Sequence, residues 1–320
     1  MIRCGGNVNV VENVYSAILV WQVQKGVLHI VKSKKKTRDR LAGKHPIAQS
    51  LITVIVSVIV VMIVAFVIEI LLSLFVMAVG NAEGADVFSI LKANSTAITL
   101  VAYAIVLVLF WLKFRKKLNG FFNTSKMGYG ILLAGGELAI CVFILIAGAV
   151  SHMTYGSFGK ALLMAAQPGV SEEVLWRIIP IALAMRSKYR EKLVVPIVVI
   201  TSIGFGLLHG VNIFAGADPI TTIFQVIYAI GIGMVYSAIY IRTGNPWITI
   251  ILHSLMDFVS FIGADMQNSN GILTQGVNAV EAVVLLIYAV IYFVNAFIIF
   301  RKDKRVDIAK TWERIWKVET

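Results

Sequence analysis

Eight apolar blocks follow one another along the chain, separated by short segments that hold most of the Lys and Arg residues. Ile47–Ile68 contains no charged residue over 22 positions, and Ser95–Leu112 contains none over 18 positions. A helix of about 18 or more apolar residues can cross a hydrocarbon core roughly 30 Å thick. The pattern therefore predicts an all-α polytopic transmembrane helical bundle of about eight spans, at residues 47–72, 95–112, 127–150, 162–185, 193–214, 220–241, 246–264 and 277–300.

Composition supports the same interpretation. Hydrophobic residues make up 58% of the 320 positions, and charged residues make up only 14%. A soluble domain is nearer half apolar and a quarter charged, so a soluble core has no room for this much apolar sequence. The two cysteines, Cys4 and Cys141, form no disulfide framework and no CxxC metal pair.

The chain has a net charge of +12, and its Lys and Arg residues cluster at the ends of the apolar blocks, where lipid headgroups lie. Basic residues gather before the first block and after the second, fourth, sixth and eighth, whereas the alternate connectors carry only Lys92 and Lys160. Positive charge favours the cytoplasmic side, which predicts that both termini are cytoplasmic. No basic stripe is interleaved with aromatics, so we expect the lipid bilayer and not nucleic acid as partner. We expect an integral protein of a bacterial cell membrane.

The chain divides into three predicted regions. Residues 1–46 form a cytoplasmic segment with an amphipathic helix at Val14–Val31 and a basic run, and no cleavable signal peptide is evident. Val14–Val31 as a ninth span is the alternative. Residues 47–300 form the membrane domain, and residues 301–320 form an amphipathic cytoplasmic tail with Trp312 and Trp316, expected to be a short helix on the surface.

Ionisable residues inside the predicted spans are the informative positions, because each costs at least a few kcal/mol near the bilayer centre. Three of them, Glu69, Glu137 and Glu281, belong to no pattern. We expect Glu69 to reach the interface and the other two to make one interhelical hydrogen bond each. The remaining six form a constellation: Glu172, Glu173, Arg177, His209, His253 and Asp257.

The fourth block carries a pair of adjacent carboxylates. Glu173 and Arg177 are four residues apart and share one helix face, with the carboxylate on the N-terminal side. Glu172 points about 100° away, which predicts that it faces a cavity while Arg177 holds Glu173. Ser171 is expected to cap a helix that starts after a chain break at Pro168-Gly169.

Two histidines come from later blocks. Phe205 and His209 share a face of the fifth block, where Gly206 and Gly210 permit a close helix approach, and His253 and Asp257 share a face of the seventh. A carboxylate one turn from an imidazole can fix its tautomer. At 1.5 Å per residue, the histidines and Glu172 lie about 16–25 Å from the nearest cytoplasmic basic residue. The three blocks therefore bring polar groups to a similar depth.

These residues resemble the motifs of the CPBP intramembrane proteases, which include the CaaX prenyl endopeptidases and the bacteriocin self-immunity (Abi) proteins. The three motifs stand in order as Glu172-Glu173-x-x-x-Arg177, Phe205-x-x-x-His209 and His253-x-x-x-Asp257. The resemblance covers about residues 165–265, and Asn-Pro-Trp at 245–247 is also similar.

The resemblance implies an eight-helix intramembrane endopeptidase that hydrolyses a membrane-embedded or lipidated peptide. It implies that Glu172 activates water, that His209, His253 and Asp257 assist, and that Glu173 and Arg177 support them. The chain departs from the family at Ile178, where Gly is common, and at Asp257, where the CaaX enzymes usually carry Asn. An ionised Asp cannot donate a hydrogen bond as Asn does.

Cofactor and function class each keep an alternative. Glu172, His209 and His253 offer the one oxygen and two nitrogen ligands of a catalytic zinc site, although no HExxH pair occurs. We expect a metal-free, glutamate-driven reaction, with zinc as the alternative. Buried Glu and His also serve proton-coupled transporters, and a non-enzymatic immunity or scaffold protein is the third possibility. Inverted repeats would favour transport, and none is evident.

Overall fold

The computed structural model describes residues 45–80, 84–115, 124–269 and 271–316. Within these ranges the chain is helical, and the only β pairing is an isolated bridge between Tyr155 and Gly263. The all-α prediction is therefore confirmed for the described residues. The predicted helix at Val14–Val31 and the basic run that follows it lie outside them.

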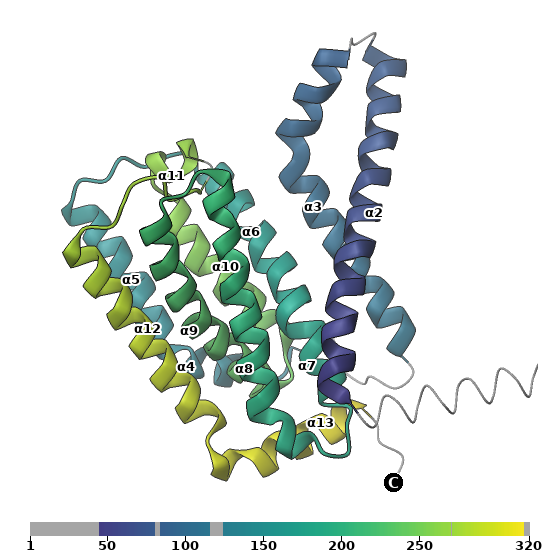
Figure 1. Cartoon of the computed structure of the whole chain (residues 1–320), viewed down its shortest axis with the longest axis vertical. Helices are drawn as coiled ribbons and strands as arrows, with labels where there is room; N and C mark the ends of the chain where they lie inside the picture. The colour runs from purple at the N-terminus through teal and green to yellow at the C-terminus, as the bar shows by residue number, and fades with distance from the viewer. Residues whose placement is uncertain (1–44, 81–83, 116–123, 270, 317–320) are drawn as a thin grey trace, which may run out of the picture. The chain divides into compact units, whose positions relative to one another are not determined.

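The two longest helices are α2 (Pro46–Gly80) and α3 (Gly84–Phe114), seen in Figure 1. Apolar residues occupy every face of α2, and many of the large ones are exposed, among them Ile59, Met62 and Phe66. A helix that is apolar on every face is typical of a membrane span. In the rest of the fold α3 packs mainly against α6.

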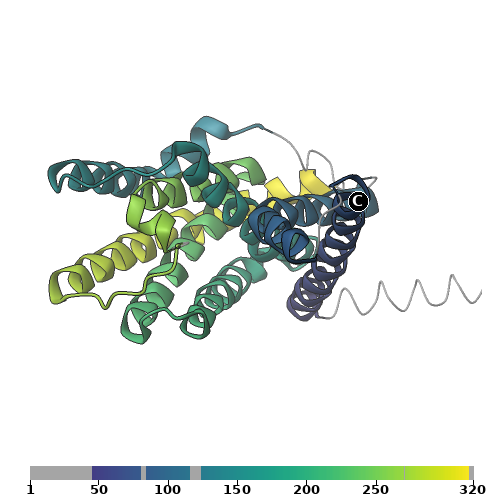
Figure 2. The same ribbon diagram turned by 90° about the horizontal axis from the view of Figure 1, so that it is seen from above.

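The remaining helices form a bundle, which Figure 1 and the view from above in Figure 2 show with its helices side by side. In chain order the elements are α4 (Met127–Leu133), α5 (Gly135–Val150), α6 (Phe158–Glu173), the π turn η1 (Val174–Ile178), α7 (Ile179–Ala184), α8 (Arg190–Leu208), the 3-10 helix η2 (His209–Ala215), α9 (Pro219–Thr243), α10 (Pro246–Phe261), α11 (Ala264–Asn268), α12 (Ala279–Phe300), η3 (Lys302–Lys304) and α13 (Arg305–Trp316).

Helix α9 is the most buried of the long helices, and it packs against both α8 and α12. At Gly206 of α8, an added Cβ would lie 2.9 Å from the carbonyl oxygen of Val226, so glycine allows the close approach of α8 to α9. Gly210 has open space around its Cα, so the predicted role in close approach holds for Gly206 alone. Helix α10 packs mainly against α6.

Several long apolar helices make this an integral membrane protein. By length and composition, five described helices can cross a membrane, and a sixth crossing arises if α4 and α5, bent by 67°, count as one span. The predicted number of about eight is not confirmed. Helix α10 has only 16 residues, and the predicted span at 162–185 is divided by the π turn into α6 and α7.

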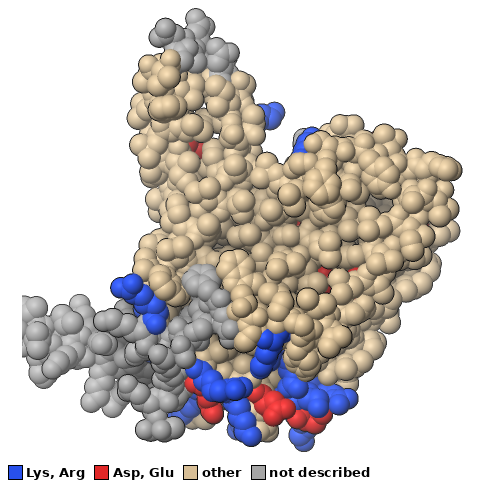
Figure 3. Space-filling model, turned by 180° about the vertical axis from the view of Figure 1, so that it is seen from behind, with Lys and Arg blue, Asp and Glu red and all other residues tan. Residues whose placement is uncertain are grey.

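On the face that Figure 3 shows, most of the charged residues gather at the end of the bundle where α13 lies. The predicted C-terminal helix is present as α13, but its tryptophans are buried in the protein. The Nε1 of Trp312 donates to the carbonyl of Ile241, and that of Trp316 donates to the carbonyl of Ala182, each at 2.8 Å. The tail thus caps the ends of α7 and α9.

Candidate active site

A polar cavity of about 590 Å³ lies among α6, α8, α9, α10 and α12. Four of the six predicted residues line it, namely Glu172, His209, His253 and Asp257. Glu173 and Arg177 lie fully buried behind them. The structure therefore brings together all six residues from three separate motifs.

Helix α6 delivers the two carboxylates without the predicted chain break. It runs unbroken from Phe158 through Pro168, and its N-cap is Ser157, which accepts from the backbone of Lys160. The expectation that Ser171 caps a new helix is therefore wrong.

Gly169 allows close helix packing and does not break the helix. An added Cβ there would lie 2.0 Å from the Oγ of Ser254 and 3.0 Å from its backbone nitrogen. Only glycine allows α10 to approach α6 this closely, and this approach carries His253 and Asp257 to Glu172.

Glu173 is the fixed carboxylate of the pair. Its Oε1 lies 3.0 Å from the NH1 of Arg177 and 2.8 Å from the Nδ1 of His253. The predicted pair at i and i+4 is thus present. The guanidinium of Arg177 also lies 3.9 Å from the ring centroid of Phe205, a cation–π contact. Because Glu173 accepts from His253, forms an ion pair with Arg177 and has no exposure, it is the anchor of the site.

His253 lies between three carboxylates. Its Nδ1 donates to Glu173, whereas its Nε2 faces the cavity, 3.6 Å from Glu172 and 3.6 Å from Asp257. The side chains of Glu172 and Asp257 are 24% and 22% exposed, in contrast with the fully buried Glu173. The two cavity carboxylates therefore remain accessible to water and to a substrate.

His209 begins η2 and lines the same cavity. Its Nδ1 lies 3.1 Å from the carbonyl oxygen of Phe205, which can only accept, so Nδ1 carries the hydrogen. The Phe205 ring packs edge-on against the imidazole, at 4.9 Å between centroids. The other nitrogen, Nε2, is not used in this hydrogen bond and can interact with a substrate.

The zinc alternative requires Glu172, His209 and His253 to converge on one ion. Among the described residues, no group of three or more His, Cys, Asp or Glu side chains is arranged to hold a metal ion. In this arrangement Glu172, His209 and His253 do not fit a shared ligand set, and no step below is assigned to a metal.

The three unpatterned carboxylates have different surroundings. Glu137 makes the expected interhelical bond, accepting from the hydroxyl of Tyr236 on α9. Glu281 does not, because its side chain accepts from the backbone of Asn278 in a capping box at the start of α12. Glu69 lies half-buried on α2.

Sequence reasoning missed Tyr236, whose ring lies 5.3 Å from the imidazole of His253. A tyrosine in an apolar helix carries no motif, and its contact with α10 comes from the packing. It missed Gln225 for the same reason: this side chain lines the cavity and accepts from Asn212 at 3.1 Å.

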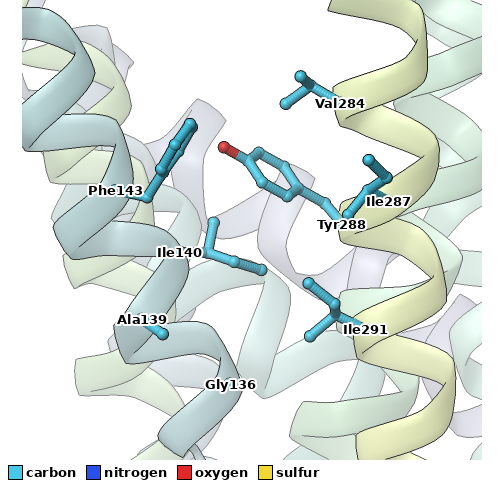
Figure 4. Close-up of a pocket in the computed structure, with 8 residues that line it drawn as sticks. All are labelled: Gly136, Ala139, Ile140, Phe143, Val284, Ile287, Tyr288 and Ile291. Atoms are coloured by element: carbon cyan, nitrogen blue, oxygen red, sulfur yellow. The ribbon is translucent and has the colours of Figure 1, made fainter.

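A second, apolar cavity of about 420 Å³ lies between α5 and α12 (Figure 4). Phe143 and Ile140 project from α5 toward Tyr288 and Ile291 of α12. Ile140 and Tyr288 also line the polar cavity, so the two cavities adjoin.

Comparison with known proteins supports the resemblance seen in the sequence. Residues 154–259 match the family described as type II CAAX prenyl endopeptidase Rce1-like. These residues contain all three motifs, so this part of the chain is a domain of that family. No curated protein and no solved structure matches the chain. A match to this family over residues 154–259 indicates an intramembrane protease.

Proposed function

We propose that this protein is an intramembrane endopeptidase that hydrolyses a peptide bond of a membrane-associated or lipidated peptide, with water activated by Glu172. The observation that carries the proposal is the arrangement around His253. One carboxylate locks its Nδ1 at 2.8 Å, and Glu172 lies 3.6 Å from its Nε2 in the cavity.

The two adjacent glutamates take different roles because their surroundings differ. Glu173 is fully buried and bound by Arg177 and His253, so it has no access to water or to substrate. Glu172 lies on the cavity and has no competing cationic Lys or Arg partner among the described ion pairs. A general base must reach the proton that it abstracts, which favours Glu172.

The proposed proton transfers return Glu172 and His253 to their starting protonation states. Glu172 takes a proton from water as the water oxygen attacks the carbonyl carbon of the substrate. The C–N bond then breaks, and the leaving nitrogen takes the Nε2 proton of a His253 imidazolium. The proton held by Glu172 returns to Nε2, since a shift of less than about 1 Å brings these atoms within hydrogen-bond range.

The oxyanion that forms in this step needs a hydrogen-bond donor. His209 supplies one from Nε2 when both its nitrogens carry hydrogen, because Nδ1 is already directed at the Phe205 carbonyl. Asp257 stands where an Asn would donate, and an ionised carboxylate only accepts. We assign Asp257 the role of stabilising the His253 imidazolium, 3.6 Å away.

We further propose that all eight predicted blocks cross a bacterial cell membrane, with both termini cytoplasmic. Support comes from the correspondence between each block and a described helix or helix pair, and from the gathering of charge at one end (Figure 3). Residues 47–300 would form the membrane domain, with residues 1–46 and 301–320 on the cytoplasmic side.

The test is Glu172→Gln, which keeps the size of the side chain and removes the base. Membranes with the wild type or the variant, at equal expression, would be compared by proteomics of membrane peptides. Cleavage products should vanish in Glu172→Gln and persist in the control Glu191→Gln, an exposed residue in the first turn of α8. Products at wild-type level in Glu172→Gln would favour a scaffold or transporter.

A further inference from the structure

Glu137 is a buried carboxylate that the proposed reaction does not use. It lies in the first turn of α5 with no solvent exposure. One oxygen, Oε1, accepts from the Tyr236 hydroxyl, and Oε2 has no hydrogen-bond partner among the described atoms. A carboxyl group buried in this way is costly, so its presence calls for a reason.

The partner of Glu137 leads directly to the site. Tyr236 is fully buried on α9, and its ring lies 5.3 Å from the imidazole of His253 with a 36° angle between the planes. The guanidinium of Arg177 lies 5.7 Å from the centroid of the same ring. Tyr236 therefore connects α5 to the two groups that surround Glu173.

The imidazole of His253 is held from several directions. Phe205 packs edge-on against it, with centroids 5.8 Å apart, and Glu173 holds Nδ1. The Tyr236 ring is a third contact, with its centroid 5.3 Å from that of the imidazole, and Glu137 accepts from the hydroxyl at the far end of that ring.

We propose that Glu137 is a positioning residue that acts through Tyr236 to hold His253 in the orientation that directs Nε2 at Glu172. This inference rests on the proposed function for its catalytic consequence. Misplacement of a reacting group by about 1 Å can cost up to a hundredfold in rate, so the orientation of this ring matters.

A purely structural role makes a different prediction. If the bond serves only to join α5 to α9, removing it lowers stability without changing the turnover of the protein that remains folded. Replacing both partners by apolar groups of similar shape can be nearly neutral for stability. The double variant Glu137→Leu/Tyr236→Phe therefore separates stability from positioning.

The first readout is independent of any substrate. Full-length protein labelled with ¹⁵N-histidine in detergent micelles contains five histidines, and the His253→Gln spectrum identifies the His253 signals. In the double variant we expect the His253 signals to shift and to broaden or split, with the melting temperature close to that of the wild type. Unchanged His253 signals would overturn the proposal.

The second readout is cleavage of a farnesylated peptide that ends in a CaaX sequence. The double variant should lose at least about tenfold in kcat with little change in KM, and Glu137→Gln, which keeps an acceptor, should retain more of kcat than Glu137→Leu. A double variant with wild-type kcat also overturns the proposal.

The design keeps the two proposals apart. If the double variant does not fold, the single variant Tyr236→Phe takes its place, because it keeps the ring and removes only the hydroxyl. Unchanged His253 signals or a wild-type kcat in this variant would overturn the proposal. If the wild type cleaves nothing, the proposed function fails, while the His253 spectra still decide whether Glu137 positions the ring. Glu281→Gln, exposed at the start of α12, is the matched control.

Discussion

Arg177→Ala is the substitution whose effect the structure defines most fully. The guanidinium has no exposure, lies 3.0 Å from Glu173 and stacks on Phe205. Alanine leaves the Glu173 carboxylate buried with only His253 as partner, and it leaves a cavity beside the Phe205 ring. Removal of one partner of a buried ion pair costs about 3–5 kcal/mol.

This loss is large enough to measure in a purified protein. Each kcal/mol shifts the melting temperature by about 2–4 °C in a domain of 150–250 residues, so the expected fall is roughly 6–20 °C. Thermal unfolding in detergent, followed by tryptophan fluorescence, is the assay. His209→Ala is the contrast, because this half-buried side chain makes one hydrogen bond to a backbone carbonyl and its loss should reduce mainly activity.

A second variant tests the reason for the loss. In Glu173→Gln/Arg177→Met the buried charges disappear together, while Gln keeps an acceptor for the Nδ1 of His253. Replacing a buried ion pair by neutral groups is often harmless to stability, so the double variant should melt above Arg177→Ala. The reasoning would be refuted if Arg177→Ala had the melting temperature of the wild type. It would also be refuted if the double variant melted no higher than Arg177→Ala.

Three further predictions follow from the packing, the charge distribution and the ligand geometry. Gly169→Ala should lose about 1–3 kcal/mol of stability and most activity, because its Cβ meets Ser254 at 2.0 Å, whereas Gly159→Ala, with open space, should melt as the wild type does. Reporter fusions should be external after residues 94 and 265 and internal after residue 190, and the reverse at any of them contradicts the topology. Exhaustive chelation should leave the cleavage activity intact. If chelation abolished the activity and added zinc restored it, the site would bind metal in a rearranged form.

Local spacing predicted the parts of the site that lie within one helix. The pairs at i and i+4, Glu173–Arg177 and His253–Asp257, are in contact as expected, at 3.0 and 3.6 Å. Helical rotation also placed Glu172 on the cavity side. These relations depend only on 3.6 residues per turn, so the sequence alone contains them.

Relations between helices were not visible in the sequence. Pro168-Gly169 indicated a break, but the helix continues, and the glycine allows α10 to approach. Glu137 and Tyr236 are 99 residues apart, and nothing in either neighbourhood marks them as partners. The π turn after Glu173 has no sequence signature of its own, because any apolar helix segment can hold the extra residue.

Burial divides the site residues into two layers, and the division explains which substitutions should affect stability. Glu173, Arg177, Tyr236 and Glu137 have no exposure and are bound to one another or to His253. Glu172 and Asp257, about a quarter exposed, have His253 at 3.6 Å as their one partner among the ion pairs of the described residues. Loss of an inner residue leaves a buried polar partner unpaired, whereas loss of a cavity residue leaves a group that water can reach. Inner substitutions should therefore lower stability and activity together, and cavity substitutions should lower activity alone. The adjacent Glu172 and Glu173, identical in sequence terms, fall on opposite sides of this division.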